Sequence, residues 1–480
     1  MLVLLWNMLC ASVIVRRRWE EEEHLPFPVI ALPLEITREG APVYRSRLLW
    51  LGFAIPCFLH GLYPNLPSWP INSARDLSAG LTYPWTGVDA MLFMVYPVGV
   101  GFGYLVGTDV SFSMWFFYLL KKALDVLGVV LGWRNPHPGD WGADAAHEFP
   151  FTSYQGWGAW TALGLSALWT GRLYFRAYFR RAWRGDPEGV DQGEPLSARA
   201  ATLGLALGFI ALCALVWSDG GSFWLPVALL GLYLLIMIAL TRLRAETAVL
   251  ATALGIITPQ NILPALVGTR NMSGADLAHM GMLSWFNNDY RSVAMPQELE
   301  GLVAQPRSRG AMRAVAFAIL AASALAIAAA AVWDLQMYYV NGASSAGVAD
   351  WRNDLANQPW SNFETWRHSP AGPDYSSIAA MAFGFAMTFL LAALRNRFVG
   401  FPLHPAAYVL NMSPANDFFW ADMMIAWAAK SLILRFGGLK GYRAALPLFY
   451  GLILGDFVTG SAWCLVGTIW HVSLFRTFPV

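Results

Sequence analysis

Residues 314–333, AVAFAILAASALAIAAAAVW, form twenty consecutive residues without a charged side chain. A helix of about 20 apolar residues is long enough to cross the hydrocarbon core of a bilayer. Similar apolar runs recur at Met1–Val15, Leu48–Tyr63, Ala90–Val106, Val110–Trp133, Tyr154–Tyr178, Ala198–Trp217, Phe223–Thr241, Ile378–Leu394 and Ala444–Trp470. The sequence therefore predicts an all-α protein, a polytopic bundle of transmembrane helices.

The composition favours the same class. Of 480 residues, 56% are hydrophobic and 13% are charged, and a soluble domain could not bury so much apolar surface. This length gives room for roughly ten to fourteen spans. They would form a single domain over residues 1–480, as one bundle or as two intimate halves of one. The net charge is +1, which indicates no nucleic-acid partner.

Two apolar stretches are interrupted by prolines and carboxamides, which break the hydrogen-bond ladder of a helix. Thr247–Gly268 contains the polar segment Thr258–Pro264, and His404–Leu434 contains Asn411–Pro414. Such breaks persist at membrane depth only where they are buried in protein or line a hydrated cavity. Each stretch is therefore predicted to form a broken or re-entrant helix.

Arginine and lysine are concentrated in a subset of the loops, which predicts that these loops face the cytoplasm. The basic clusters lie at Arg16–Arg18, Arg176–Arg184, Arg242–Arg244, Arg307–Arg313, Arg395–Arg397 and Arg435–Arg443. The polar segment 335–376 falls on the opposite face. It is predicted to form an extracytoplasmic loop or a small cap.

Charged side chains at the bilayer centre cost on the order of 2.5–3.5 kcal/mol, so their presence in apolar runs needs a reason. Lys121 and Asp125 are spaced i,i+4, either as a neutralised structural pair or as an ion-coupling pair. Asp456 lies among small residues that allow close approach; it faces a pathway, or backbone N–H groups cap it. Asp422 shares a helical face with Lys430, unless Lys430 snorkels to the surface instead.

A second set surrounds the predicted break in Thr247–Gly268. Arg242 and Glu246 form another i,i+4 pair just before it, and Gln260 and Asn261 present carboxamides within it. Free backbone groups at broken helices bind ions and zwitterions. The candidate solute-binding residues are therefore Gln260, Asn261, Asp422 and Asp456. The candidate coupling pairs are Lys121 with Asp125 and Arg242 with Glu246.

The sequence contains no phosphate-binding loop, nucleophile elbow or dinucleotide fingerprint, so we expect no nucleotide hydrolysis. The preferred interpretation is a protein that is not an enzyme and has no cofactor. His137 and His147 flank an acidic loop with Asp140, Asp144 and Glu148, which could bind a cation weakly. The histidines lack the spacing of a metal site, and no metal is assigned. Any uphill transport would then depend on an ion gradient.

Residues 16–28, RRRWEEEEHLPFP, resemble a segment of the oligopeptide transporter superfamily in which a basic helix end leads through acidic residues to a Phe-Pro turn. Pro447–Gly460, PLFYGLILGDFVTG, resembles that superfamily's final glycine-rich stretch, and Phe418–Arg435 resembles the hairpin before it. Thr108–Tyr118 is similar to a distant, bacterial branch of the superfamily. The resemblance implies a multi-pass protein of the bacterial inner membrane. The Asn-Pro-x-Pro-Phe-type signature of the peptide carriers is absent, so no cargo follows.

Three functions stay open at this point. The preferred one is a secondary transporter of a small polar solute, of the peptide, amino-acid or metal-chelate class. Its partners would be the lipid bilayer and the solute, with a homo-oligomer left open. The second is a membrane-embedded enzyme that processes glycans or lipids with Trp351–Asp354 and Trp366–His368. The third is a non-catalytic helical subunit of a larger complex.

Overall fold

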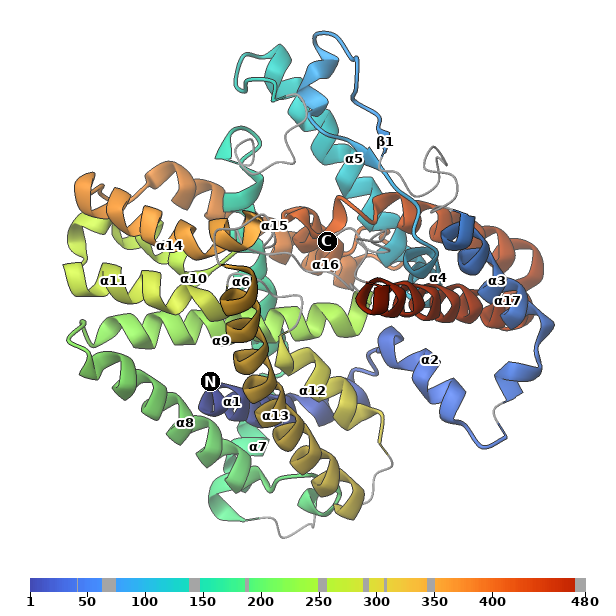
Figure 1. The fold of residues 1–480 in the computed structure, drawn as a ribbon, viewed down its shortest axis with the longest axis horizontal. Coiled ribbons are helices and arrows are strands. Elements are labelled where there is room, and N and C mark those ends of the chain that lie inside the picture. The colour runs from blue at the N-terminus through green and yellow to red at the C-terminus, as the bar shows by residue number, and fades with distance from the viewer. Residues whose placement is uncertain are drawn as a thin grey trace. The chain divides into compact units, whose positions relative to one another are not determined.

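A computed structural model describes residues 1–40, 42–62, 75–137, 147–185, 190–248, 257–287, 293–305, 309–342 and 350–470. In these ranges the chain is almost entirely helical, which confirms the all-α prediction (Figure 1). The described strands are β1 (Arg75–Asp76) and β2 (Leu92–Phe93), which pair antiparallel. The short non-α helices are Arg18–Glu22, Pro42–Arg45, Trp85–Val88, Val190–Gly193, Thr269–Asn271, Leu283–Phe286 and Pro414–Asn416.

The chain divides into two compact units. The first unit comprises residues 1–25, 160–242 and 253–382, and the second comprises 26–159, 243–252 and 383–480. The helices within the first unit are α1 (Leu2–Arg17), α7 (Arg172–Arg184), α8 (Ala198–Ser218), α10 (Pro259–Val267), α11 (Gly274–Met282), α12 (Ala294–Val303), α13 (Arg309–Asn341) and α14 (Asp350–His368). Those within the second unit are α2 (Pro28–Thr37), α3 (Arg47–Leu62), α4 (Pro97–Leu105), α5 (Thr108–Val130), α16 (Pro405–Asn411) and α17 (Trp420–Trp470). The helices α6 (Thr152–Thr170), α9 (Trp224–Thr247) and α15 (Tyr375–Arg397) contribute to both.

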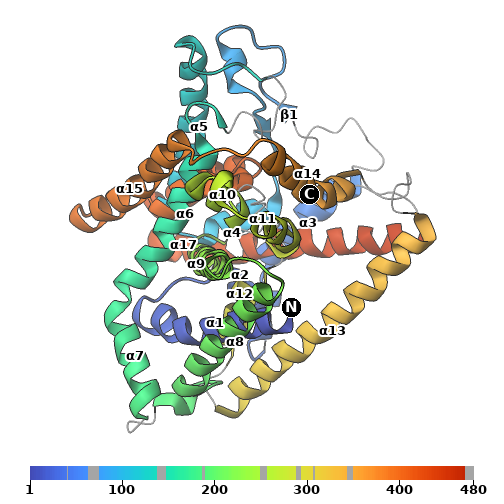
Figure 2. The same cartoon turned by 90° about the vertical axis from the view of Figure 1, so that its left-hand side faces the viewer.

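Five of the described helices are long and apolar enough to cross a membrane, namely α8, α9, α13, α15 and α17. The long helix α13 is seen from the side in Figure 2. The number is below the ten to fourteen spans expected because several apolar runs fold into shorter helices. The run Ala90–Val106, for example, forms β2 and the nine-residue helix α4. Pro97 marks the start of that helix, and a proline in the first turn has no N–H to lose.

Helix α17 consists of two helices that meet at Gly438, whose φ of 57° and ψ of −159° are not helical. Asp422, before the bend, and Asp456, after it, both accept hydrogen bonds at the N-terminal end of α4. Lys430 and Tyr442, nearer the bend, both contact residues at its other end. The two arms of α17 therefore fold back on each other as a helical hairpin along α4.

The predicted break at Asn411–Pro414 is confirmed, since α16 ends at Asn411 and α17 begins only at Trp420. In the other broken stretch, α9 ends at Thr247 and α10 begins at Pro259. Residues 249–256 lie outside the described ranges. Thr258–Pro264 is itself the start of α10 rather than the break, because the Thr258 side chain caps the helix and Pro259 occupies its first turn.

The core of the first unit lies between α8, α9, α10 and α11. Its buried residues are Cys213, Leu225, Leu229, Leu230, Leu263, Met272, Leu277 and Met280. Helix α14 lies within the segment 335–376, and its residues Phe363 and Trp366 pack against this core. The segment that the sequence predicted as a loop or cap is thus largely helical. Its extracytoplasmic position stays a prediction.

Candidate functional site

Helix α4 of the second unit is short, packs on α17 and is buried over nearly its whole length. Its sequence, PVGVGFGYL, is nine residues long, and Pro97–Tyr104 are all buried. At 1.5 Å per residue such a helix is about 14 Å long, which is too short to cross a bilayer. Both helix ends must therefore find hydrogen-bond partners inside the protein.

Two carboxylates bind the N-terminal end of α4. Asp422 Oδ1 accepts a hydrogen bond from the Tyr96 N–H at 2.8 Å, and Asp456 Oδ2 accepts one from the Val98 N–H at 2.8 Å. Both aspartates are fully buried. The free N–H groups and the positive end of the helix dipole stabilise negative charge at this position.

His60, near the end of α3, completes this site. Its Nε2 atom lies 2.5 Å from Asp456 Oδ1, and the imidazole is fully buried. Asp422 Oδ2 has no hydrogen-bond partner among the described residues. The site thus combines two buried carboxylates, an imidazole and a helix terminus, and one carboxylate oxygen is left without compensation. We call Asp422, Asp456 and His60 the carboxylate site.

Glycines bring α4 and the two arms of α17 into direct contact. A Cβ atom added at Gly99 would lie 2.7 Å from Asp422 Cγ, and one added at Gly101 would lie 2.9 Å from the Phe449 carbonyl oxygen. Where the second arm meets α3, a Cβ at Gly455 would lie 2.5 Å from the Phe53 carbonyl oxygen. The prediction that small residues near Asp456 allow a backbone to approach closely is therefore confirmed.

At the C-terminal end of α4 the charged partner is a cation, Lys430. Lys430 Nζ donates to the Val106 carbonyl at 2.6 Å and lies 4.9 Å from the centre of the Tyr442 ring. Lys430 is buried, so the alternative in which it snorkels to the surface is wrong. Anions at the N-terminus and a cation at the C-terminus both oppose the dipole of α4.

A cavity of about 920 Å³, widely open to the protein surface, adjoins the Lys430 end of this helix. Trp427 and Ser431, on either side of Lys430 in the sequence, line the cavity, and so does Asp109 at the start of α5. Asp109 forms an ion pair with Arg395 in the cavity wall. Apolar walls with a few charged groups are typical of small-molecule sites.

The predicted ion pair between Lys121 and Asp125 is wrong. Lys121 Nζ instead pairs with Asp417 Oδ1 at 2.7 Å, and Asp125 Oδ1 pairs with Arg134 Nη1 at 3.0 Å. Spacing by four residues makes a pair available on a helix, but partners from other segments lie closer here.

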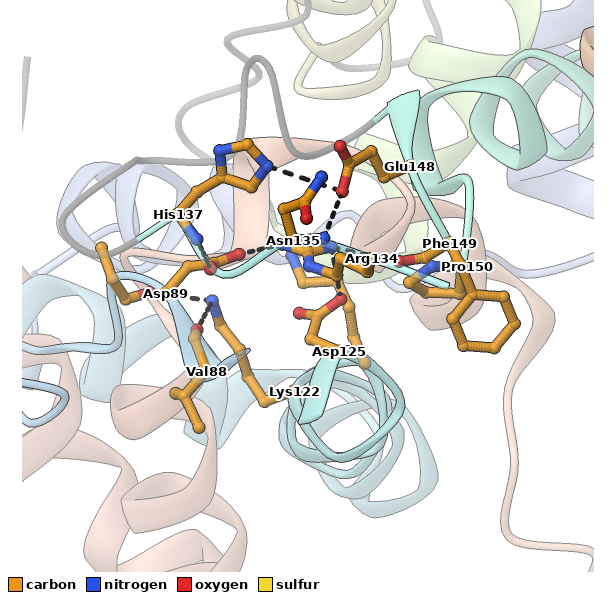
Figure 3. Close-up of polar contacts among 12 residues, drawn as sticks. Val88, Asp89, Lys122, Asp125, Arg134, Asn135, His137, Glu148, Phe149 and Pro150 are labelled. Atoms are coloured by element: carbon orange, nitrogen blue, oxygen red, sulfur yellow. Dashed lines mark hydrogen bonds and ion pairs between the residues drawn. The ribbon is translucent and has the colours of Figure 1, made fainter. Parts of the chain in front are cut away.

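Arg134 is the centre of a separate polar network at the end of α5, shown in Figure 3. Its guanidinium pairs with Asp89 and Asp125, and it also donates to the Phe149 carbonyl at 3.2 Å. Lys122 Nζ donates to the carbonyls of Val88 and Ala90, each at 2.8 Å. The network ties three chain segments together. It pairs Asp125 with Arg134 and occupies the Lys122 ammonium group with backbone carbonyls, which indicates a structural role.

The acidic loop beside this network is only partly described. His137 Nε2 lies 3.5 Å from Glu148 Oε2, which also accepts from the Asn135 N–H at 2.8 Å. The other acidic residues that suggested weak cation binding, Asp140 and Asp144, lie outside the described residues. The weak cation site stays a prediction.

The predicted carboxamide residues, Gln260 and Asn261, belong to the first unit. Gln260 is buried, and its Oε1 accepts a hydrogen bond from Asn287 Nδ2 at 2.5 Å. A cavity of about 20 Å³, lined in part by Gln260, Asn261 and Ser284, lies beside it. Such a volume holds about one water molecule. In the described structure this site therefore has no room for a solute.

The remaining predicted residues are spread over both units. Arg242 forms an ion pair with Glu23 at 2.7 Å, a partner that the i,i+4 spacing with Glu246 did not suggest. Glu246 is half-buried near the end of α9. Gln260, Asn261 and Arg242 belong to the first unit, and the other candidates to the second. Of all the predicted residues, the structure brings together Asp422 and Asp456.

The alternative in which a backbone N–H group caps Asp456 is confirmed, since the Val98 N–H donates to it. The sequence did not reveal His60 or the Tyr96 N–H that binds Asp422. A histidine in the apolar run Leu48–Tyr63 and the alternating glycines of α4 were the available signals. For the alternative enzyme site, Arg367 and His368 lie exposed on the last turn of α14. The side chains of Trp351–Asp354 lie outside the described residues.

The fold and site define an all-helical membrane protein in which a short, glycine-rich helix is held between buried charges. The chain matches the Family of unknown function (DUF6785) over residues 1–479 and belongs to that family. None of the curated proteins matches it.

Proposed function

We propose that this protein is a secondary transporter of the bacterial inner membrane that moves a small polar solute and is coupled to an ion gradient. The carboxylate site carries this proposal. Ionisable groups buried among membrane-crossing helices are costly, and they mark ion or proton pathways in transporters. Short helices whose ends lie inside the protein are a second feature of this class.

Proton exchange at this site would change how firmly α4 is held. When Asp422 and Asp456 are charged, each accepts a charge-assisted hydrogen bond from an N–H group of α4. Protonation removes the charge and weakens these bonds, because charge-assisted hydrogen bonds are about twice as strong as neutral ones. His60 of α3 gives Asp456 a further hydrogen-bond partner. A proton bound at the N-terminal end of α4 would thus change how the helix is held, and the contacts at its C-terminal end would change with it.

The cavity beside Lys430 would then be the place where the solute enters. It lies next to the C-terminal end of α4, and its wall offers the Asp109 carboxylate and the Arg395 guanidinium among aromatic side chains. These groups suit a small polar or zwitterionic solute, in line with the peptide, amino-acid or metal-chelate class. The resemblance of residues 16–28 and Pro447–Gly460 to the oligopeptide transporter superfamily supports the same proposal.

The test is solute uptake by the purified protein in proteoliposomes. Labelled amino acids, di- and tripeptides and metal chelates are offered with a proton gradient, without one, and with an uncoupler. We expect gradient-dependent accumulation of one class. Asp456→Asn and Asp422→Asn should abolish this accumulation while the exchange of solute across the membrane continues, because a neutral amide cannot carry the proton.

Asp417→Asn is the matched control, since Asp417 lies just before α17 and its half-buried pair with Lys121 is outside the carboxylate site. This variant should accumulate solute as the wild type does. Full accumulation by folded Asp456→Asn protein would overturn the coupling role. Hydrolysis or transfer of an offered glycan or lipid, lost in Arg367→Ala or His368→Ala, would instead establish the enzyme alternative. Uptake of no solute class in any condition would contradict transport and favour a subunit role.

A further inference from the structure

Helix α7 carries an unusual combination of side chains. Its sequence, RLYFRAYFRRAWR, contains five arginines, five aromatic residues and no carboxylate. The preceding helix α6 ends at Thr170, so the predicted membrane run Tyr154–Tyr178 divides there and its last residues belong to α7.

One face of α7 is fixed to the first unit. Phe175, Tyr178 and Ala182 are buried, and the helix packs on α8 (Figure 2). Tyr174 donates its hydroxyl hydrogen to the Ile14 carbonyl of α1 at 3.1 Å. Arg199 of α8 donates to the Ala182 carbonyl at 3.1 Å. The helix is therefore held by contacts along its length, and its other side is presented in a defined orientation.

The opposite side is exposed and both basic and apolar, and we call it the α7 outer face. It consists of Arg172, Leu173, Arg176, Phe179, Arg180, Trp183 and Arg184. Leu173 is 72% exposed and Trp183 is 84% exposed. Water solvates such large apolar side chains poorly. The bilayer interface accommodates both kinds of group, because aromatic rings favour the headgroup level and guanidinium groups bind phosphate in a bidentate manner.

The charges on the α7 outer face select among lipids. Arg181 is paired with Asp191 at 3.2 Å and points away from this face. Arg176, Arg180 and Arg184 have no carboxylate partner in the part of the chain that the structure describes. Unpaired arginines attract anionic lipids, while a zwitterionic headgroup offers no net charge to them. We propose that the α7 outer face binds the headgroups of anionic phospholipids at the cytoplasmic leaflet.

The α7 outer face is independent of the carboxylate site, so lipid binding there does not depend on whether the chain transports a solute. The experiment is a thermal-unfolding titration of the full-length protein in detergent micelles containing phosphatidylglycerol or phosphatidylcholine. Wild-type protein should be stabilised at a lower mole fraction of phosphatidylglycerol than of phosphatidylcholine. Each arginine near an anionic surface contributes roughly fivefold in binding. After allowance for screening by salt, R176Q/R180Q should raise the half-maximal mole fraction of phosphatidylglycerol about tenfold.

The matched control is R270Q/R367Q, which removes two exposed arginines of the same unit outside α7. It should titrate as the wild type does, and R176K/R180K should recover most of the response. A second readout is quenching of tryptophan fluorescence by brominated phosphatidylglycerol, part of which should disappear in Trp183→Phe.

Equal stabilisation by both lipids would overturn the proposal. So would a folded R176Q/R180Q protein that titrates like the wild type, or one that loses no more response than the control variant. If heparin stabilised the wild type as well as phosphatidylglycerol does, the surface would be a general polyanion site rather than a lipid site.

Discussion

Gly99→Ala tests whether the contact between α4 and Asp422 depends on the absence of a side chain at Gly99. The added Cβ would lie 2.7 Å from Asp422 Cγ and 3.0 Å from Asp422 Cβ. Rotation of the carboxylate alone cannot relieve both contacts, so the two helices must separate or the carboxylate must leave the Tyr96 N–H. The substitution should therefore destabilise the fold even though alanine is the better helix former.

The magnitude follows from three contributions. Overpacking costs roughly 1–3 kcal/mol, and weakening a buried hydrogen bond to a charged group costs about 1.5–3 kcal/mol. Replacing glycine by alanine within a helix stabilises the fold by at most about 1 kcal/mol. Because relaxation will relieve part of the first two costs, we expect Gly99→Ala to lower the free energy of unfolding by about 2–4 kcal/mol.

The assay is denaturant or thermal unfolding of the purified protein in one detergent, with Gly231→Ala as the matched control. Nothing lies within 4 Å of a Cβ added at Gly231 in α9, so that variant should be as stable as the wild type or slightly more so. In an Asp422→Ala background the Gly99→Ala cost should fall below about 1 kcal/mol, because most of the clashing atoms are gone. An unchanged cost in that background, or no cost in the wild type, would refute the reasoning.

Two further predictions concern groups outside the carboxylate site. Arg134→Gln leaves Asp89 and Asp125 buried without their shared cation, so the free energy of unfolding should fall by about 3–5 kcal/mol; a loss below 1 kcal/mol in the same unfolding assay would contradict the structural role of the network. Burial acts to raise the pKa of Asp276, but hydrogen bonds from Ser222 and Ser273 outweigh it, and its pKa lies below the ordinary value. A depressed pKa contributes stability above about pH 4 that is lost as the pH falls through the folded-state pKa. Asp276→Asn should therefore cost about 1–2 kcal/mol at pH 7, and melting curves from pH 3 to 7 should show its deficit shrinking on acidification. A deficit that is the same at both ends of the range would refute this assignment.

The sequence by itself determined the class of fold. An uninterrupted uncharged run such as residues 314–333 is long enough to cross a bilayer as a helix, and a helix satisfies all its backbone groups within the segment. Local breaks were also readable, since proline and capping side chains act within a few residues. The break after Asn411 is observed where the sequence placed it, and the Thr258 side chain caps α10.

Only the tertiary structure decided which groups meet. Tyr96 and Asp422 are 326 positions apart, and Val98 and Asp456 are 358 apart, so no local spacing could pair them. The i,i+4 rule failed for Lys121 for the same physical reason: a charged side chain takes the nearest partner in space, and that partner depends on how distant helices pack. The residue types in the sequence supplied the charges, whereas the bend at Gly438 and the close contacts at the glycines of α4 brought two of them to one helix end.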